Sequence, residues 1–113
     1  MNIQIFGTKK SSDTRKAERF FKERGIRFQS VDMIDKGLSK GELTSVIRAV
    51  GGLDALLDEN TKDQDALALI RHISADDRME KLLENQKVIK MPIVRNGAQA
   101  TVGYQPDVWR SWT

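Results

Sequence analysis

The feature that most constrains the fold is a strand–helix–strand pattern in residues 3–32. Two short apolar runs predict strands, and apolar residues at i, i+3 and i+4 between them predict a helix with one buried stripe. Gly7 ends the first strand, and Gly25 suits the position just after the helix. Strands joined through a helix pair in parallel with a right-handed crossover, so we expect a βαβ unit. The apolar positions are Ile3, Ile5 and Phe6, then Ala17, Phe20 and Phe21, then Ile26, Phe28 and Val31.

The middle of the chain is predicted to be helical. Helix starts are expected where a capping residue precedes an apolar stripe. Gly51-Gly52 is predicted to end the first of these helices, and residues 53–58 to form a short helical turn. The three predicted starts are a capping box of Ser39 with Glu42, a second capping box of Thr61 with Gln64, and Ser74.

The last third of the sequence returns to strand patterns. Strands are predicted at residues 93–95 and 100–103, joined by an Asn96-Gly97 turn whose loop length stays open. Pro106 suits the first position of a final helix. The order βαβ, helices, ββα predicts a thioredoxin-like α/β fold. We expect a mixed four-stranded sheet with a helical insert at about residues 39–85, in one domain of residues 1–113.

Composition excludes several kinds of site. The chain has no cysteine, so disulfides and thiolate metal sites are excluded. Its one histidine, His72, gives no basis for a histidine metal cluster or a Ser–His pair, and no bound metal or cofactor is expected. No apolar run approaches the ~20 residues that span a bilayer, and no secretory signal opens the chain. We therefore expect a cytoplasmic protein, and a monomer, because nothing favours an obligate dimer.

Positive charge is concentrated at the start of the chain. Residues 1–27 hold eight lysines and arginines against three carboxylates, a net charge of +5 within a chain whose total is +3. This excess is either a solvated helix face or a means of attracting a small anion or an acidic partner. Direct nucleic-acid binding is not expected, because aromatic residues are few and the other helices are acidic.

The segment FGTKKSSDTRKAERFF, residues 6–21, has the outline of a site at a helix start. Ser11 or Ser12 can cap the helix, and Lys9, Lys10 and Arg15 add positive charge near its exposed N–H groups. A thiol at position 11 would ionise easily there. A serine hydroxyl needs an adjacent base, and the loop supplies none. From residue chemistry, Ser11 is therefore a cap rather than a nucleophile, although the loop can still bind an anion.

Three motifs resemble the family of glutaredoxin-linked arsenate reductases and Spx-type transcription regulators, over essentially the whole chain. They are IFGTKKSSDTRKAERFFKERGI, KMPIVRNG and TVGYQPDVW. The resemblance implies a thioredoxin-like fold and a cis peptide bond before Pro92. It also implies that position 11 is that of a reactive cysteine, or in some relatives selenocysteine. Whether Ser11 is natural or a replacement stays open.

The sequence departs from the family at the residues that hold an oxyanion. Arginines of arsenate reductases fall where this chain has Asp58, Met91 and either Tyr104 or Gln105, whereas the arginine at the helix start is kept as Arg15. A carboxylate repels arsenate and a thioether donates no hydrogen bond. Arsenate reduction is therefore not expected.

The resemblance implies that the parental form is a glutathione- or thiol-dependent oxidoreductase and that this chain is redox-inactive because of Ser11. Glutathione, or a small anionic or thiol substrate, would bind at the loop and the cis-proline. An alternative is an Spx-like adaptor that binds the RNA polymerase alpha subunit through the region of Arg48 and Gly52, although the Spx-type CxxC switch is absent because Ser11 and Thr14 replace its cysteines. The residues assigned to substrate binding are Lys9, Lys10, Ser12, Thr14, Arg15, Met91 and Pro92.

Overall fold

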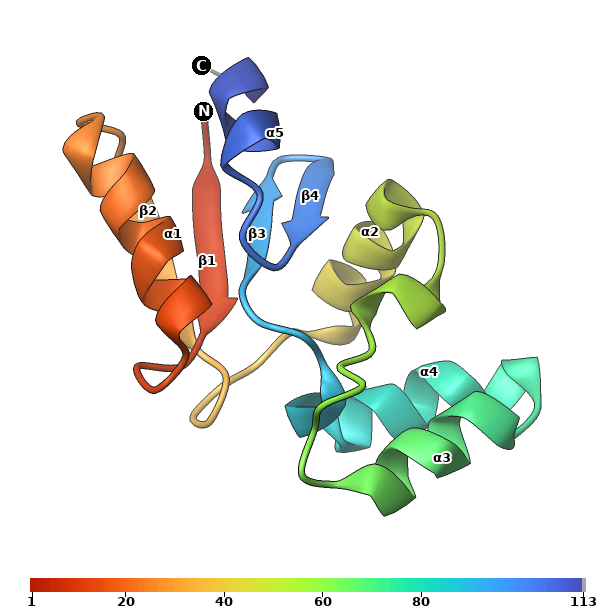
Figure 1. The fold of residues 1–113 in the computed structure, drawn as a ribbon. Coiled ribbons are helices and arrows are strands. Elements are labelled where there is room, and N and C mark those ends of the chain that lie inside the picture. The colour runs from red at the N-terminus through yellow and green to blue at the C-terminus, as the bar shows by residue number, and fades with distance from the viewer. Residues whose placement is uncertain (113) are drawn as a thin grey trace.

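The computed structural model describes residues 1–112 and contains one four-stranded mixed sheet in the order β2-β1-β3-β4 (Figure 1). β1 pairs with β2 in parallel and with β3 antiparallel, and β3 pairs antiparallel with β4. The strands are β1 (Ile3–Gly7), β2 (Phe28–Asp32), β3 (Ile93–Asn96) and β4 (Gln99–Val102). The helices are α1 (Ser12–Glu23), α2 (Lys40–Val50), α3 (Gln64–His72), α4 (Ala75–Glu84) and α5 (Pro106–Trp112), with short 3-10 turns η1 (Leu53–Leu56) and η2 (Gln86–Val88).

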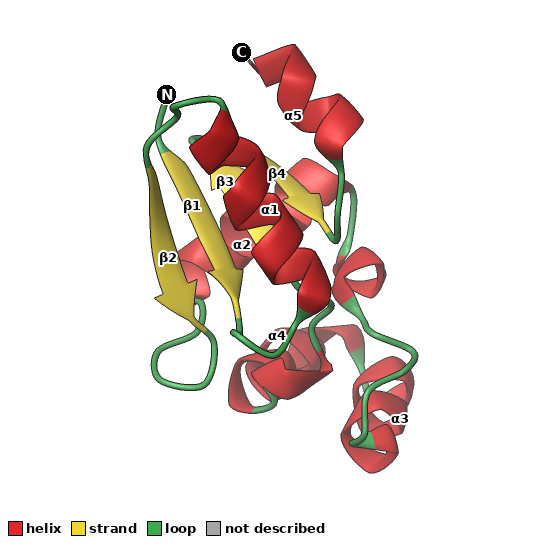
Figure 2. Ribbon diagram, turned by 60° about the vertical axis from the view of Figure 1, so that its left-hand side comes forward, coloured by secondary structure: helices red, strands yellow, loops and turns green. Residues whose placement is uncertain are grey.

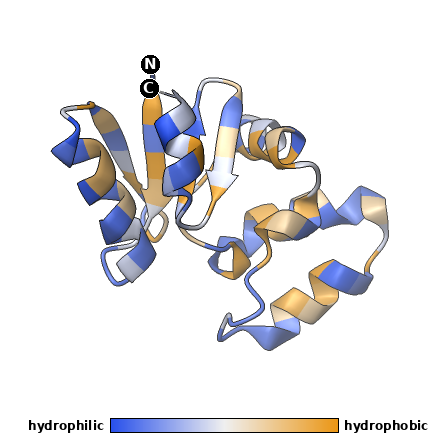
Figure 3. Cartoon of the chain, turned by 45° about the horizontal axis from the view of Figure 1, so that its top comes forward, coloured by the Kyte–Doolittle hydropathy of each residue, from blue (hydrophilic) through white to orange (hydrophobic). Residues whose placement is uncertain are grey.

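The sheet separates two hydrophobic clusters. Figure 2 shows α1 and α5 on one face and α2 on the other. Ile3 and Ile5 of β1 pack with α1 and Trp109 on the first face, whereas Phe6 joins α2 and the later helices on the second. This division follows from the alternation of side chains along a strand. In Figure 3 the central strand β1 is mainly hydrophobic and the helices alternate in character.

Most helix boundaries follow the predicted local signals. Ser39 and Glu42 form the capping box of α2, and Gly51 ends that helix with φ 88°. The predicted capping box of Thr61 with Gln64 is wrong. Asp63 caps α3 instead, because its carboxylate accepts the Ala66 N–H at 3.1 Å while the Gln64 side chain donates to the Thr61 carbonyl.

Two other details differ from the predictions. Ser74 occupies the N-cap position of α4, but its hydroxyl bonds the Asp77 carboxylate at 3.0 Å rather than a backbone N–H. The β3–β4 hairpin begins one residue later than an Asn96-Gly97 turn requires. Asn96 pairs with Gln99, so Gly97 and Ala98 form a two-residue loop, and Gly97 takes φ 61°. Glycine at the first loop position fits a type II′ turn.

The segments on either side of α3 and α4 run alongside each other. Asp58 N–H donates to Val88 O at 2.8 Å, Lys90 N–H donates to Leu56 O at 2.7 Å, and Leu57 bridges Ile89 antiparallel. α3 and α4 lie beyond the end of the sheet, opposite the chain termini (Figure 1). Within residues 1–112, no helix combines the length and apolar character needed to cross a bilayer.

Candidate functional site

Ser11 is the N-cap residue of α1. Its backbone is extended, and its hydroxyl oxygen accepts the Thr14 N–H at 3.2 Å. The Arg15 N–H donates to the Ser11 carbonyl, and the Ser11 N–H donates to the Thr8 carbonyl, each at 3.1 Å. Ser11 is half-buried. An atom at this position sits at the positive end of the α1 dipole and receives a hydrogen bond from the helix.

Thr14 lies in the first turn of α1, three residues after the Ser11 cap. Its side chain is buried, and the Oγ1 atom has no hydrogen-bond partner among the described residues. Gly7 makes this packing possible, because a Cβ at Gly7 would lie 2.3 Å from Thr14 Oγ1. Thr14 therefore packs against β1 at Gly7, and its hydroxyl is too buried to make the substrate contact that the sequence predicted.

The basic residues of the loop have different roles. The Arg15 side chain donates from Nη1 to the Lys9 carbonyl at 2.6 Å, so it braces the loop that precedes the cap. Lys9, Lys10 and Ser12 are exposed to solvent. Their position at the helix start favours an anionic group next to Ser11.

The Met91–Pro92 peptide bond is cis, as the family resemblance implies. Pro92 is buried, and its carbonyl accepts the Gly103 N–H at 2.9 Å, which fixes the proline beside the end of β4. Met91 is half-buried. Met91 and Thr8 line the same groove of about 480 Å³, so the cis-proline segment and the start of the Ser11 loop face one space.

The residues at the family's arginine positions are held by other contacts. The Asp58 carboxylate accepts the Asn60 N–H at 2.9 Å. The Tyr104 ring packs edge-on against Trp109 with ring centroids 5.5 Å apart, and Gln105 donates to the Val102 carbonyl at 3.3 Å. None of these three side chains offers a guanidinium to an oxyanion.

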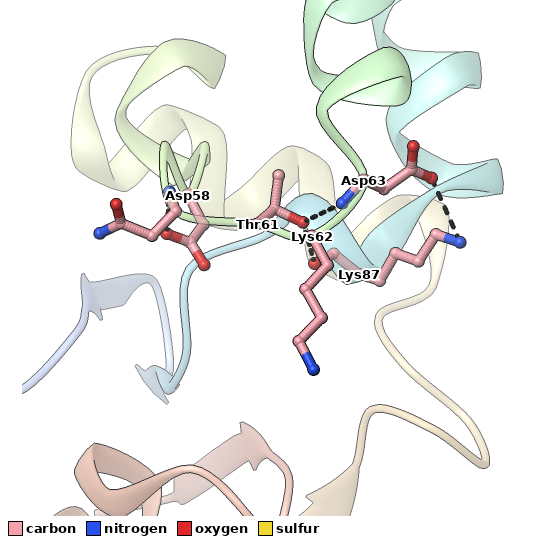
Figure 4. Close-up of a pocket in the computed structure, with 6 residues that line it drawn as sticks. Asp58, Thr61, Lys62, Asp63 and Lys87 are labelled. Atoms are coloured by element: carbon pink, nitrogen blue, oxygen red, sulfur yellow. Dashed lines mark hydrogen bonds and ion pairs between the residues drawn. The ribbon is translucent and has the colours of Figure 1, made fainter.

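Asp58 lines a polar pocket of about 630 Å³ that no sequence pattern predicted (Figure 4). Lys87 reaches across it to Asp63 with Nζ–Oδ2 3.2 Å. The Ala66 N–H and the Lys87 ammonium hold the pKa of Asp63 below its ordinary value of 3.8. Lys87 is separated from Asp63 by twenty-four positions, so only the fold could reveal the pair. The lining residues are Asp58, Asn60, Thr61, Lys62, Asp63 and Lys87.

The alternative partner-binding residues lie far from the loop in the fold. Arg48 is exposed in the last turn of α2, and Gly52 follows that helix with φ 144°. α2 covers the sheet face opposite α1 (Figure 2). The structure therefore brings Thr8 of the loop and Met91 into one lining, whereas Arg48 and Gly52 lie at the end of a helix on the opposite face of the sheet.

The sequence of the chain is similar to those of ArsC-family proteins and of Spx regulators. The model of the ArsC family matches residues 6–112. Global transcriptional regulator Spx 2 of Oceanobacillus iheyensis is 29% identical over 109 residues, which cover 95% of this chain and 80% of that protein. The uncharacterized protein YusI of Bacillus subtilis is 27% identical, with 95% of this chain and 94% of that protein covered.

Solved structures share the fold. An arsenate reductase from Vibrio cholerae aligns with a TM-score of 0.83 at 24% identity, covering 98% of this chain and 97% of that one. The glutaredoxin-like protein NrdH-redoxin from Escherichia coli aligns with a TM-score of 0.52 at 15% identity, covering 100% and 96%. The fold is therefore thioredoxin-like, as the order of elements predicts. With its family match spanning residues 6–112, the chain belongs to the ArsC family.

Proposed function

We propose that this chain is an ArsC-family protein whose loop and cis-proline are built for thiol chemistry, and that Ser11 makes it redox-inactive as it stands. One observation carries the proposal: Ser11 is the N-cap of α1 and accepts the Thr14 N–H at 3.2 Å. A thiolate here would gain that hydrogen bond, the helix dipole and the nearby lysines. A hydroxyl keeps its proton, because none of the loop side chains is a base.

With a thiol at position 11, the expected reaction is disulfide exchange with glutathione as co-substrate. The thiolate attacks one sulfur of a disulfide, forming a new S–S bond while the other sulfur leaves as a thiolate. A glutathione thiolate then attacks the mixed disulfide, and the thiolate at position 11 is released. Glutathione has to resolve the intermediate, because the chain has no cysteine to do so. In this scheme Lys10 attracts the anionic substrate, and Met91 and Pro92 position it.

Arsenate is not the proposed substrate. Recognition of a tetrahedral oxyanion is strongest with planar guanidinium groups that donate two parallel hydrogen bonds. Arg15 is kept, but its Nη1 already donates to the Lys9 carbonyl at 2.6 Å. The family's other arginine positions hold Asp58, Met91 and either Tyr104 or Gln105, so none of them holds a cation.

The test compares two serines that cap helices in the same way. Ser11 accepts the Thr14 N–H at 3.2 Å, and Ser39 accepts the Glu42 N–H at 3.1 Å, but the carboxylate of Glu42 lies beside Ser39. Alkylation rates against pH should give Ser11→Cys a thiol pKa at least ~1 unit below the ordinary value near ~8.5, and lower than that of Ser39→Cys. Ser11→Cys should also form a glutathione adduct. An unshifted thiol pKa and no adduct would contradict the proposal.

A second candidate function is an adaptor for the RNA polymerase alpha subunit. Similarity to Spx 2 of O. iheyensis favours it, and Arg48 is exposed at the end of α2 as such a contact requires. Pull-down with the isolated alpha C-terminal domain should then retain this chain and lose Arg48→Glu. Absence of binding by the unmodified chain would dismiss this candidate.

A further inference from the structure

A groove begins at the candidate site and runs away from it between two walls. Thr8 and Met91 form its inner end, and its volume is about 480 Å³. The turn after β2 forms one wall, and the segment from the end of α4 through η2 forms the other. Figure 1 shows both walls at the end of the sheet where α1 begins. The lining residues are Thr8, Met33, Ile34, Lys36, Gly37, Leu83, Glu84, Asn85, Gln86, Lys87 and Met91.

The groove presents apolar side chains to solvent. Ile34 is 76% exposed, the highest value among the large hydrophobic residues of positions 1–112. Met33, Leu83 and Met91 are half-buried along the same lining. An exposed apolar group beside a concave surface is typical of a binding site. Methionine side chains adapt to different apolar partners, so this lining suits a variable side chain.

The lining of the groove holds two lysines and one carboxylate, and Asp35 is exposed beside Lys36 in the same turn. Lys36 is exposed and forms no ion pair within residues 1–112. Lys87 pairs with Asp63 but keeps 69% of its side chain exposed. The one carboxylate in the lining, Glu84, is 3.3 Å from Lys81. The two lysines of the lining, with its one carboxylate next to Lys81, favour an acidic ligand.

The inner end of the groove offers free backbone groups. Pairing of β3 begins at Ile93, and no hydrogen bond among residues 1–112 uses the N–H or C=O of Met91. Unpaired main-chain groups at the end of a strand can bind an extended peptide. The wall is fixed in place, because the Gln86 amide bonds both the N–H and the carbonyl of Leu38 at 2.7 Å each.

We propose that this groove binds an extended peptide segment of a protein partner, with apolar residues at its centre and acidic residues flanking them. The apolar side chains lie between Met33 and Leu83, and the acidic ones face Lys36 and Lys87. The inference rests on the proposed function, since it places the peptide beside position 11. It makes the substrate of that site a protein rather than an inorganic oxyanion.

The first test uses the chain with Ser11 in place and two labelled heptapeptides. One is Asp-Glu-Leu-Ser-Leu-Glu-Asp, and the other has lysine at every acidic position. Fluorescence anisotropy should show the acidic peptide binding about tenfold more tightly. Lys36→Glu should weaken that binding about fivefold or more, because it reverses charge at the rim. Lys22→Glu makes the same charge change on the exposed surface of α1 and should leave the affinity unchanged.

A second arm tests the apolar wall and separates the two proposals. Ile34→Ser should weaken the acidic peptide several-fold, since it removes the exposed apolar contact. Equal binding of both peptides, or equal effects of Lys36→Glu and Lys22→Glu, would overturn the groove proposal. Ser11→Cys is then treated with bis(2-hydroxyethyl) disulfide, which is too small to need the groove. Exchange with that reagent alone would sustain the proposed function without the groove, and peptide binding without exchange would sustain the groove without the function.

Discussion

At the scale of single residues, the buried hydroxyl of Thr14 conflicts with its surroundings. Oγ1 has no hydrogen-bond partner in the described chain, and the side chain lies against the backbone of Gly7. Burying an unsatisfied hydroxyl costs about 1–3 kcal/mol. Replacing it with a methyl group of similar shape removes that cost without opening a cavity.

Thr14→Val should therefore raise the free energy of unfolding by about 1 kcal/mol. Gly7→Ala should lower it by about 1–3 kcal/mol, because the added methyl overlaps the Thr14 side chain. Urea denaturation of the two variants measures both effects. Loss of stability in Thr14→Val would contradict the assignment of the Thr14 hydroxyl as an unpaired buried group.

At the scale of elements, the Gln86 amide joins η2 to the loop before α2. It receives the Leu38 N–H and donates to the Leu38 carbonyl, as a neighbouring strand would. Gly37 fits against it, since a Cβ there would lie 2.5 Å from Gln86 Oε1. One side chain thus positions the wall of the groove described above.

Gln86→Ala should lower the free energy of unfolding by about 2 kcal/mol, because two backbone groups lose their partners. Gln86→Glu keeps an acceptor for the Leu38 N–H but leaves the Leu38 carbonyl unpaired, so its loss should be smaller. Hydrogen exchange at residues 33–38 should accelerate in Gln86→Ala before exchange in the sheet does. Uniform acceleration would show that Gln86 does not fix this loop locally.

The start of α3 gives the fold a dependence on acid. The pKa of Asp63 is lowered in the folded state, chiefly by the Ala66 N–H and then by Lys87. The unfolded chain therefore binds a proton more readily, and this contribution is present above the ordinary pKa of 3.8 and is lost as pH falls through the lowered value. As pH falls below 3.8, the free energy of unfolding should therefore decrease less in Asp63→Asn than in the unmodified chain. Identical pH profiles by thermal denaturation would contradict the assignment.

Elements with local signals were predictable, and those fixed across the fold were not. The capping box of Ser39 with Glu42 and the glycine after α2 act within four residues, so the sequence shows them directly. At α3 two capping residues compete, and the backbone geometry selects Asp63 over Thr61. The hydrogen bond between Gln86 and Leu38 joins residues 48 positions apart, and no local sequence pattern predicts it.

At the scale of the whole molecule, Trp109 closes the core on one face of the sheet. It is fully buried, and its ring lies 5.3 Å from the rings of Phe20 and Phe21. The indole N–H donates to Thr101 Oγ1 at 2.8 Å, which ties α5 to β4. The sheet lies between this hydrophobic cluster and the other one, so a substitution that destabilises one cluster should also destabilise the other.

Trp109→Ala should lower the free energy of unfolding by about 3–5 kcal/mol. Trp109→Phe should cost less, because it keeps an aromatic ring and loses mainly the bond to Thr101. We expect the chain to unfold in one transition in both variants, with near- and far-ultraviolet circular dichroism changing together. Separate transitions would indicate that the two faces unfold independently.

The thioredoxin-like architecture and the cis peptide bond before Pro92 could be anticipated from the order of elements and the family motifs. The sequence also located the Ser11 loop, because capping and charge are local properties. The groove could not be anticipated, since Met33, Leu83 and Met91 are distant in sequence and only the folded chain brings them into one lining. Long-range packing, rather than residue chemistry, decides such surfaces.

The antiparallel contact between residues 56–58 and 88–90 has an evolutionary consequence. Asp58 precedes α3 and Val88 follows α4, and the Asp58 N–H donates to the Val88 carbonyl at 2.8 Å. The segment that holds α3 and α4 therefore begins and ends at adjoining points of the fold, and we call it the helical cassette. Because Leu67, Ile70 and Leu82 anchor that cassette in a shared core, deleting it would expose apolar surface. Another pair of helices with similar buried apolar residues could replace the cassette without disturbing the cis-proline. Proteins that share this fold could therefore acquire new specificity by exchanging this one segment.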